Sequence, residues 1–129
     1  MENTIRVLIA DEDKEFCAML RETFCIDERM EIIGTYGDGN GLAQRILQDA
    51  PDVVLMDLVL PGVDGLTVLH ELNEAEPAKM PVIFVVSSFA SQETTEECNA
   101  LGVSFYLRKP VDLQALAQRV CRYGGQRNY

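Results

Sequence analysis

Long apolar stretches are missing from this sequence. No uninterrupted run of hydrophobic residues is longer than that at 82–86, whereas a membrane-spanning helix needs about 20 such residues. The N-terminal residues also lack the basic region and apolar core that define a secretory signal peptide. We therefore expect a cytoplasmic protein that makes no contact with a membrane.

Cysteine is sparse, and its spacing is irregular. The thiols of Cys17, Cys25, Cys98 and Cys121 form no CxxC pair, which removes the usual basis for a zinc site or a dithiol redox site. We expect four reduced thiols.

Basic residues are few compared with acidic ones. Eleven lysines and arginines stand against 21 aspartates and glutamates, for a formal net charge of −10. A surface of this sign repels nucleic-acid phosphates, so direct nucleic-acid binding by this chain is not expected. Otherwise the 129 residues have an ordinary globular composition, with 47% hydrophobic and 25% charged residues. One folded domain is predicted.

Apolar segments alternate with helix-like segments along the whole chain. The predicted strands are 5–10, 30–36, 53–56, 82–86 and 104–107. Each precedes a segment with helical spacing of apolar residues, such as Phe16, Leu20 and Phe24. The last helix is expected to start at a cap on Asp112 and to end near Tyr123. This alternation predicts an α/β fold, (βα)5, with a doubly wound, five-stranded parallel sheet.

Acidic, hydroxyl and basic side chains follow four of the predicted strands. In chain order they are Asp11, Glu12, Asp13, Asp57, Ser87, Ser88 and Lys109. Ligand sites of open parallel sheets lie at the carboxyl ends of the strands, so we expect these side chains to meet. Carboxylates gathered in one cleft repel each other unless a cation lies between them, and their oxygens suit Mg²⁺. Beside a metal, an ammonium and a hydroxyl, Asp57 has the surroundings of a nucleophile that accepts a phosphoryl group.

Taken singly, each of these residues has an ordinary structural explanation. Asp13 fits the cap of a helix, Lys109 fits a solvated loop, and Ser87 fits a hydrogen bond to the backbone. It is their coincidence at the ends of four strands that favours a site.

Several motifs occur in a characteristic order along the chain. They are Asp11-Glu12 after an apolar strand, the run VVLMDLVLPGVDG, Ser87 after VIFVV, and Lys109-Pro110. Over nearly the whole chain, this order resembles the receiver domains of bacterial two-component response regulators, which have the flavodoxin-like (CheY-like) fold. Within the family, the segments VLIADEDKEF, MEIIGT, PDVVLMDLVLPGVDGLTVL and SSFASQ are most similar to the receivers of stage 0 sporulation regulators.

The resemblance implies a signalling domain that catalyses only its own phosphorylation and dephosphorylation. Asp57 would accept phosphate from a histidine kinase or a relay phosphotransferase. Ser87 and Lys109 would contact the phosphoryl group, and Ser87 and Tyr106 would form the switch that responds to it. A cis peptide bond before Pro110 is also implied.

The resemblance further implies a cation site. Asp11, Glu12, Asp57 and the backbone carbonyl of Val59 would bind Mg²⁺ or Mn²⁺, with Asp11 acting through water. The second member of the acidic pair is Glu12, one methylene longer than an aspartate.

Three other functions compete with this interpretation. A haloacid-dehalogenase-like phosphotransferase would use Asp11 as nucleophile and Asp13 as acid, but it leaves Asp57 unexplained. A flavodoxin-like carrier would need a first loop that binds phosphate, and this loop is acidic. A receiver fold kept only for protein binding would not need Asp57, Ser87 and Lys109 together.

We expect a receiver over 1–123 and the start of a linker or tail over 124–129, because Gly124, Gly125 and the polar residues after them have the composition of a flexible linker. We expect this receiver to control a C-terminal DNA-binding domain in transcription regulation, through a phosphorylation-dependent homodimer. A stand-alone relay receiver is the alternative.

Overall fold

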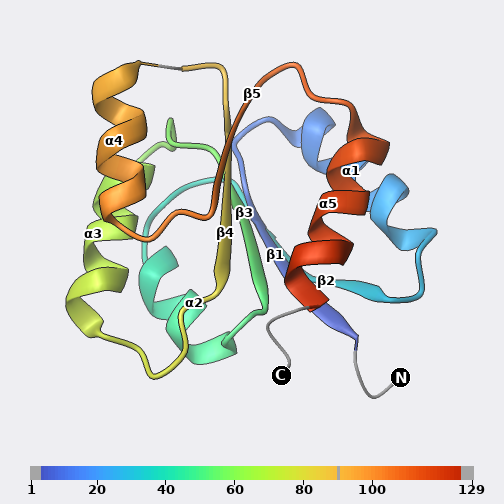
Figure 1. The fold of residues 1–129 in the computed structure, drawn as a ribbon, viewed down its shortest axis with the longest axis horizontal. Coiled ribbons are helices and arrows are strands. Elements are labelled where there is room, and N and C mark those ends of the chain that lie inside the picture. Colours follow the sequence, from blue (N-terminus) through green and yellow to red (C-terminus); the bar gives the residue numbers. More distant parts are fainter. Residues whose placement is uncertain (1–3, 90, 126–129) are drawn as a thin grey trace.

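The computed structural model describes residues 4–89 and 91–125, so of the predicted tail, 124–129, the part 126–129 lies outside the described residues. Strands and helices alternate along the chain as predicted (Figure 1). The strands are β1 (Ile5–Ala10), β2 (Met30–Tyr36), β3 (Val53–Met56), β4 (Val82–Ser87) and β5 (Phe105–Arg108). The helices are α1 (Lys14–Cys25), α2 (Leu42–Asp49), α3 (Gly65–Ala75), α4 (Gln92–Ala100) and α5 (Leu113–Gly125).

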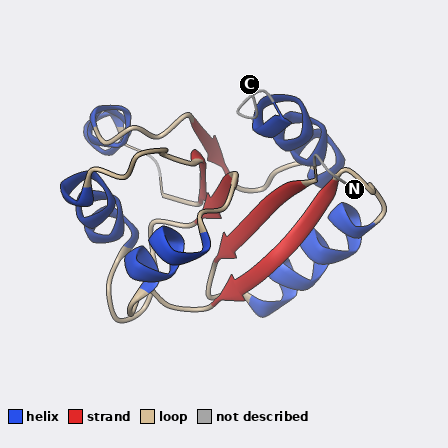
Figure 2. Cartoon of the chain, turned by 90° about the horizontal axis from the view of Figure 1, so that it is seen from below, coloured by secondary structure: helices blue, strands red, loops and turns tan. Residues whose placement is uncertain are grey.

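The strands form one parallel sheet in the order β2-β1-β3-β4-β5. Its central strand, β3, is buried at every position, and so is β4. Burial on both faces explains why these two strands are apolar almost throughout. Helices α1 and α5 cover one face, and α2, α3 and α4 cover the other (Figures 1 and 2). This is the doubly wound arrangement that the sequence predicts.

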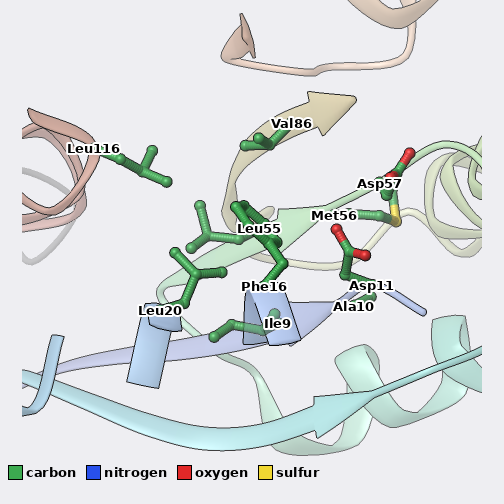
Figure 3. A pocket seen from close by; sticks show the side chains of 10 residues that line it. All are labelled: Ile9, Ala10, Asp11, Phe16, Leu20, Leu55, Met56, Asp57, Val86 and Leu116. Carbon is green, nitrogen blue, oxygen red and sulfur yellow. The ribbon is translucent and has the colours of Figure 1, made fainter. Parts of the chain in front are cut away.

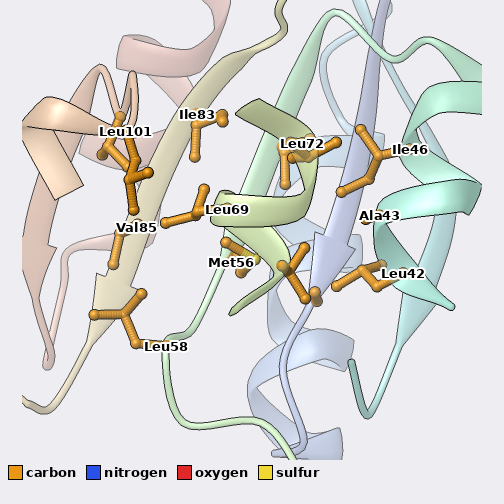
Figure 4. Close-up of a cluster of buried hydrophobic side chains, with 14 of the residues drawn as sticks. Leu42, Ala43, Ile46, Met56, Leu58, Leu69, Leu72, Ile83, Val85 and Leu101 are labelled. Carbon is orange, nitrogen blue, oxygen red and sulfur yellow. The ribbon is translucent and has the colours of Figure 1, made fainter. Parts of the chain in front are cut away.

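Each face of the sheet has its own apolar core. The core under α2, α3 and α4 is shown in Figure 4, and its fully buried members include Leu8, Val54, Leu69, Ile83 and Cys98. The core under α1 and α5 includes Val7, Phe24, Leu55, Phe84 and Val120. Successive strand residues alternate between the two cores, because side chains of a strand point to opposite faces in turn.

Side-chain caps fix where four of the helices begin, and at α5 the carboxylate of Asp112 accepts from two amides of the first turn, as predicted. Asp13 accepts a hydrogen bond from the Phe16 amide at the start of α1, and Ser91 accepts one from Thr94 at the start of α4. Asp64 does the same for α3. The prediction that Asp13 fits a helix cap is therefore confirmed. The Asp13 carboxylate is hydrogen-bonded to the first turn of α1.

Helix α5 is longer than predicted, because it continues to Gly125 rather than ending near Tyr123. The glycines do not stop the helix because Gly124 is a packing residue. A Cβ atom at Gly124 would lie 2.6 Å from Cγ2 of Val53 and 3.0 Å from Cγ2 of Ile5. The absence of a side chain lets the end of α5 lie directly on β1 and β3.

Three further predictions concern the bounds of the last two strands, the state of the cysteines and the absence of a membrane-spanning helix. Strand β5 begins and ends one residue later than predicted, and β4 includes Ser87, because Ser87 and Arg108 still pair across the two strands. All four cysteines are free thiols, as predicted. In the described part of the chain, no helix is long and apolar enough to cross a membrane.

Candidate functional site

The site is built at the carboxyl edge of the sheet. Asp11 and Asp57 directly follow the paired residues Ala10 and Met56 of β1 and β3. The Asp57 amide donates to the Ala10 carbonyl at 2.9 Å, and the Lys109 amide donates to the Ser87 carbonyl at 2.9 Å. Backbone pairing therefore continues one residue beyond these strands and fixes the starting points of the side chains.

Three donors surround the Asp57 carboxylate. Its Oδ1 accepts hydrogen bonds from the Ser87 hydroxyl at 2.8 Å and from the Val59 amide at 3.0 Å. Its Oδ2 accepts one from Nζ of Lys109 at 3.0 Å. Hydrogen bonds from such different sources hold the carboxylate in one orientation at the edge of the sheet.

Lys109 links the two aspartates of the site. Its Nζ lies 2.8 Å from Oδ2 of Asp11 as well as 3.0 Å from Oδ2 of Asp57, and it also lies over the ring of Phe16. Burial of the ammonium by itself lowers its pKa, but the hydrogen bonds and charges of the two aspartates outweigh burial and raise the pKa of Lys109. The lysine is therefore a fixed positive charge at neutral pH. The peptide bond before Pro110 is cis, as the resemblance implies.

Asp11 is almost completely buried, with 4% of its surface exposed. Its Oδ1 accepts a hydrogen bond from the Asp13 amide at 2.9 Å, and its Oδ2 pairs with Lys109. Figure 3 shows Asp11 and Asp57 at one end of a narrow pocket whose other lining residues are apolar. The apolar surroundings strengthen the attraction between these carboxylates and the lysine.

A family model described as "Response regulator receiver domain" matches residues 7–121, which is most of the chain. The chain belongs to the response regulator receiver domain family. Receiver domains take part in two-component signalling: they are phosphorylated, bind Mg²⁺ at an acidic site, and interact with histidine kinases or phosphotransferases.

Solved structures agree with the family assignment at the level of the fold. A CheY-like receiver domain protein from Methanospirillum hungatei is 22% identical, with a TM-score of 0.83 and 97% of each chain covered. The REC domain of AraT from Geobacillus stearothermophilus is 27% identical, with a TM-score of 0.78, covering 97% of this chain and 95% of that one. A DNA-binding response regulator of the LuxR family from Staphylococcus aureus is 20% identical, with a TM-score of 0.82 and coverages of 93% and 98%.

The donor set of this receiver suits a hard divalent cation. Asp11, Glu12, Asp57 and Val59 line one open pocket together with Lys109, and carboxylate oxygens are the ligands that Mg²⁺ prefers. As the side chains lie, the described residues contain no group of three acidic, histidine or cysteine side chains close enough to hold a metal. Glu12 is exposed, so its side chain is free to turn toward the two aspartates. The residues therefore fit the cation, provided that Glu12 moves.

Tyr106 lies next to the same edge of the sheet. Its hydroxyl donates to the carbonyl of Phe89, in the segment that follows β4. Burial raises the pKa of Tyr106, and the nearby Cys98 and Asp57 add to this effect. Ser87 and Tyr106 are thus both connected to Phe89, since the Phe89 amide donates to the Ser87 hydroxyl at 3.3 Å.

The structure gives no support to the haloacid-dehalogenase interpretation. The carboxylate of Asp13, the acid of that interpretation, accepts from the Phe16 amide as the cap of α1, and its nucleophile, Asp11, is buried and paired with Lys109. His70 lies away from this site: its Nε2 is 3.0 Å from Oε2 of Glu97, between α3 and α4, and both side chains are about half exposed.

Sequence reasoning missed two contributions to the site. One is the amide of Val59, for which the resemblance implies only a carbonyl role. The other is the contact that the glycine-rich segment 37–41 makes with the loop after Asp57. In the sequence, only the closely spaced glycines of the two loops indicate this contact.

Proposed function

We propose that Asp57 is the phosphoacceptor of this receiver and that its donor is a phosphohistidine of a kinase or a relay phosphotransferase. The observation that carries the proposal is the set of donors on Asp57: the Ser87 hydroxyl, the Val59 amide and the Lys109 ammonium. Hydrogen-bond donors already aimed at a carboxylate are well placed for the phosphoryl oxygens that arrive next to it.

The transfer is a displacement at phosphorus. An Asp57 oxygen attacks the phosphorus, the new O–P bond forms, and the P–N bond breaks with its electron pair returning to the donor histidine. Lys109 and Ser87 then donate to the phosphoryl oxygens. These contacts hold the incoming group in line and offset its charge.

Asp11, Glu12, Asp57 and the carbonyl of Val59 would hold Mg²⁺ or Mn²⁺. When bound, the cation supplies the positive charge that lets a phosphate dianion approach three carboxylates. Lys109 alone cannot do so, because it is already shared between Asp11 and Asp57.

The test is labelling with acetyl phosphate, followed by intact-mass measurement with and without MgCl₂. We expect one phosphate per chain only with the metal, and none in Asp57→Asn. Asp49→Asn is the matched control, because Asp49 is the last residue of α2, where its carbonyl accepts from Arg6 near the amino end of β1. Undiminished labelling of Asp57→Asn would contradict the assignment.

We further propose that phosphorylation acts through Ser87 and Tyr106 on the face formed by α4, β5 and α5, so that two receivers pair. Support comes from the bonds of both residues to Phe89, which connect Asp57 with this face. Gel filtration with and without beryllofluoride tests it, and the expected result is a dimer only with the phosphoryl mimic. A monomer under both conditions would contradict the pairing.

The output proposed for this receiver is transcription regulation of the sporulation type, through a C-terminal DNA-binding domain. Support comes from the segments that resemble stage 0 sporulation regulators and from the net charge of −10, which leaves DNA contact to another domain. One similar structure is described as a DNA-binding response regulator. The codons that follow Tyr129 decide the output: a basic helix-turn-helix domain supports it, and a stop favours a stand-alone relay receiver.

A further inference from the structure

Two loops interlock beside the Asp57 site. The segment 37–41, between β2 and α2, lies against residues 61–63 of the loop that runs from Asp57 to α3. We call this contact the loop clasp. The amide of Gly39 donates to the carbonyl of Pro61 at 3.1 Å. Gly39 is buried, although both of its neighbours in the chain are exposed.

Both sides of the clasp depend on the absence of a side chain. A Cβ atom at Gly39 would lie 1.8 Å from the carbonyl oxygen of Val63, so no other residue fits without moving that backbone. In the other loop, Gly62 has a φ of +78°, which strains any residue with a side chain, and a Cβ there would lie 2.4 Å from Oδ1 of the exposed Asn40 side chain, which would have to turn away. Each loop therefore presents a glycine to the other.

The clasp holds a loop that supplies part of the site. That loop begins at Asp57 and includes Val59, whose amide donates to the Asp57 carboxylate. It is tied at its base by the Gly65 amide, which donates to the Leu58 carbonyl at 2.8 Å. Between these points its tip rests on Gly39. The clasp also borders the acidic residues, since Asp38 and Pro61 line the same groove as Glu12.

We propose that Gly39 and Gly62 are positioning residues of the receiver: their clasp sets the place of Val59 and thereby prepares the site for Mg²⁺ and the phosphoryl group. This inference rests on the proposed function, because it concerns the same site. The glycines touch no reacting atom and act through the backbone of residues 59–63. Groups that orient metal ligands from behind commonly change metal affinity by about ten- to a hundredfold when they are lost.

The first experiment compares Gly39→Ala with Gly37→Ala. The two glycines lie in the same segment, but a Cβ at Gly37 meets nothing within 4 Å. We expect Gly39→Ala to shift the Val59 amide resonance without metal and to weaken binding in a titration with MgCl₂ alone by about tenfold or more. Gly37→Ala should leave both unchanged.

The second experiment decides the matter if Gly39→Ala does not fold. Gly62→Ala is compared with Gly41→Ala, because Gly41 also has a positive φ, of +68°, while its Cβ would be 3.8 Å from the nearest atom, in Gln44. Both variants place a side chain at a similar positive φ, yet only Gly62→Ala should lose Mg²⁺ affinity. Adding Asn40→Ala, which removes the obstructing side chain, should restore part of it.

One combination of results would overturn the proposal. If Gly39→Ala or Gly62→Ala unfolds at a lower temperature but keeps the wild-type Mg²⁺ affinity and Val59 resonance, the clasp is only structural and the proposal is overturned. Failure of the proposed function is distinguishable, because wild-type protein would then not be labelled at Asp57. The shift of the Val59 resonance in metal-free Gly39→Ala would still test the clasp.

Discussion

The Ser87 hydroxyl lies 2.8 Å from Oδ1 of Asp57, and Ser87 itself is fully buried. In the described part of the chain, Ser87 and Asp11 are the two buried polar residues, and both belong to the Asp57 site. Burying a polar group costs free energy unless it is hydrogen-bonded. Here both groups are bonded within the site, so the fold maintains an ordered polar cluster at one edge of an otherwise apolar core.

Replacing Ser87 by alanine should slow phosphorylation without preventing folding. Asp57 keeps the Val59 amide and Lys109, so the carboxylate stays in place, but a donor for the phosphoryl oxygens is gone. A hydrogen bond to a charged group is worth about 1.5–3 kcal/mol, so labelling by acetyl phosphate should slow at least about tenfold. Ser104→Ala is the control, because Ser104 is exposed and lies just before the amino end of β5, away from the site. Equal rates in both variants would argue against a role for Ser87.

Replacing Lys109 by methionine should affect both stability and phosphorylation. The change leaves the buried Asp11 carboxylate without its ammonium, at a cost of about 1–3 kcal/mol in the free energy of unfolding without metal. Labelling should fall by about a hundredfold or more, because a charge that stabilises the transferred group is lost. Urea unfolding and intact-mass kinetics measure the two effects. Lys79→Met, at an exposed lysine 3.9 Å from Asp52, should show neither.

Magnesium should stabilise the folded receiver. A ligand that binds only the folded state adds about 2.7 kcal/mol to the free energy of unfolding at a hundred times its Kd. Thermal unfolding in MgCl₂, against NaCl of equal ionic strength, should therefore show a higher Tm for the wild type. Asp11→Asn should lose most of this increase, because it removes a carboxylate from the proposed cation site. An equal increase in that variant would place the cation elsewhere.

Most of the fold could be predicted from the sequence because β1, β3 and β4 are short, mainly apolar segments that end at a polar residue. The same rule brought Asp11, Asp57, Ser87 and Lys109 to one edge, since parallel strands end together. Contacts between backbones are harder to predict, because the sequence pattern indicates them only weakly. In the sequence, a glycine that ends a helix cannot be distinguished from a glycine that leaves space for a neighbouring residue. The burial of Gly124 and the role of Gly39 could therefore be recognised only in the structure.

Tyr106 should make stability depend on alkaline pH. Burial, chiefly, raises its pKa, so the folded chain keeps the phenol proton at a pH where the unfolded chain has lost it. Its contribution to stability is therefore complete below about pH 10, the ordinary tyrosine value, and is lost as the pH rises through the raised pKa. Urea unfolding between neutral pH and about pH 10.5 should show a smaller decline for Tyr106→Phe than for the wild type. Parallel declines would contradict this prediction.

The end of α5 offers a test of packing in two adjacent glycines. At Gly124 an alanine Cβ would lie 2.6 Å from Cγ2 of Val53, so either the helix or the strand must move. Overpacking of this kind costs about 1–3 kcal/mol. At Gly125 the Cβ would lie 3.6 Å from Cδ1 of Ile5, which is an ordinary contact. There alanine should be neutral or stabilising by up to about 1 kcal/mol, because it favours the helix more than glycine does.

Urea unfolding of Gly124→Ala and Gly125→Ala should therefore give free energies of unfolding that move in opposite directions, or at least differ clearly. Because both changes add one methyl group to the same helix, helix propensity cannot account for the difference, and only the distance to the sheet can. Equal effects would mean that α5 does not pack on β1 and β3 as closely as described. A loss confined to Gly124→Ala would establish that the receiver fold extends at least to this residue, so that any linker begins beyond it.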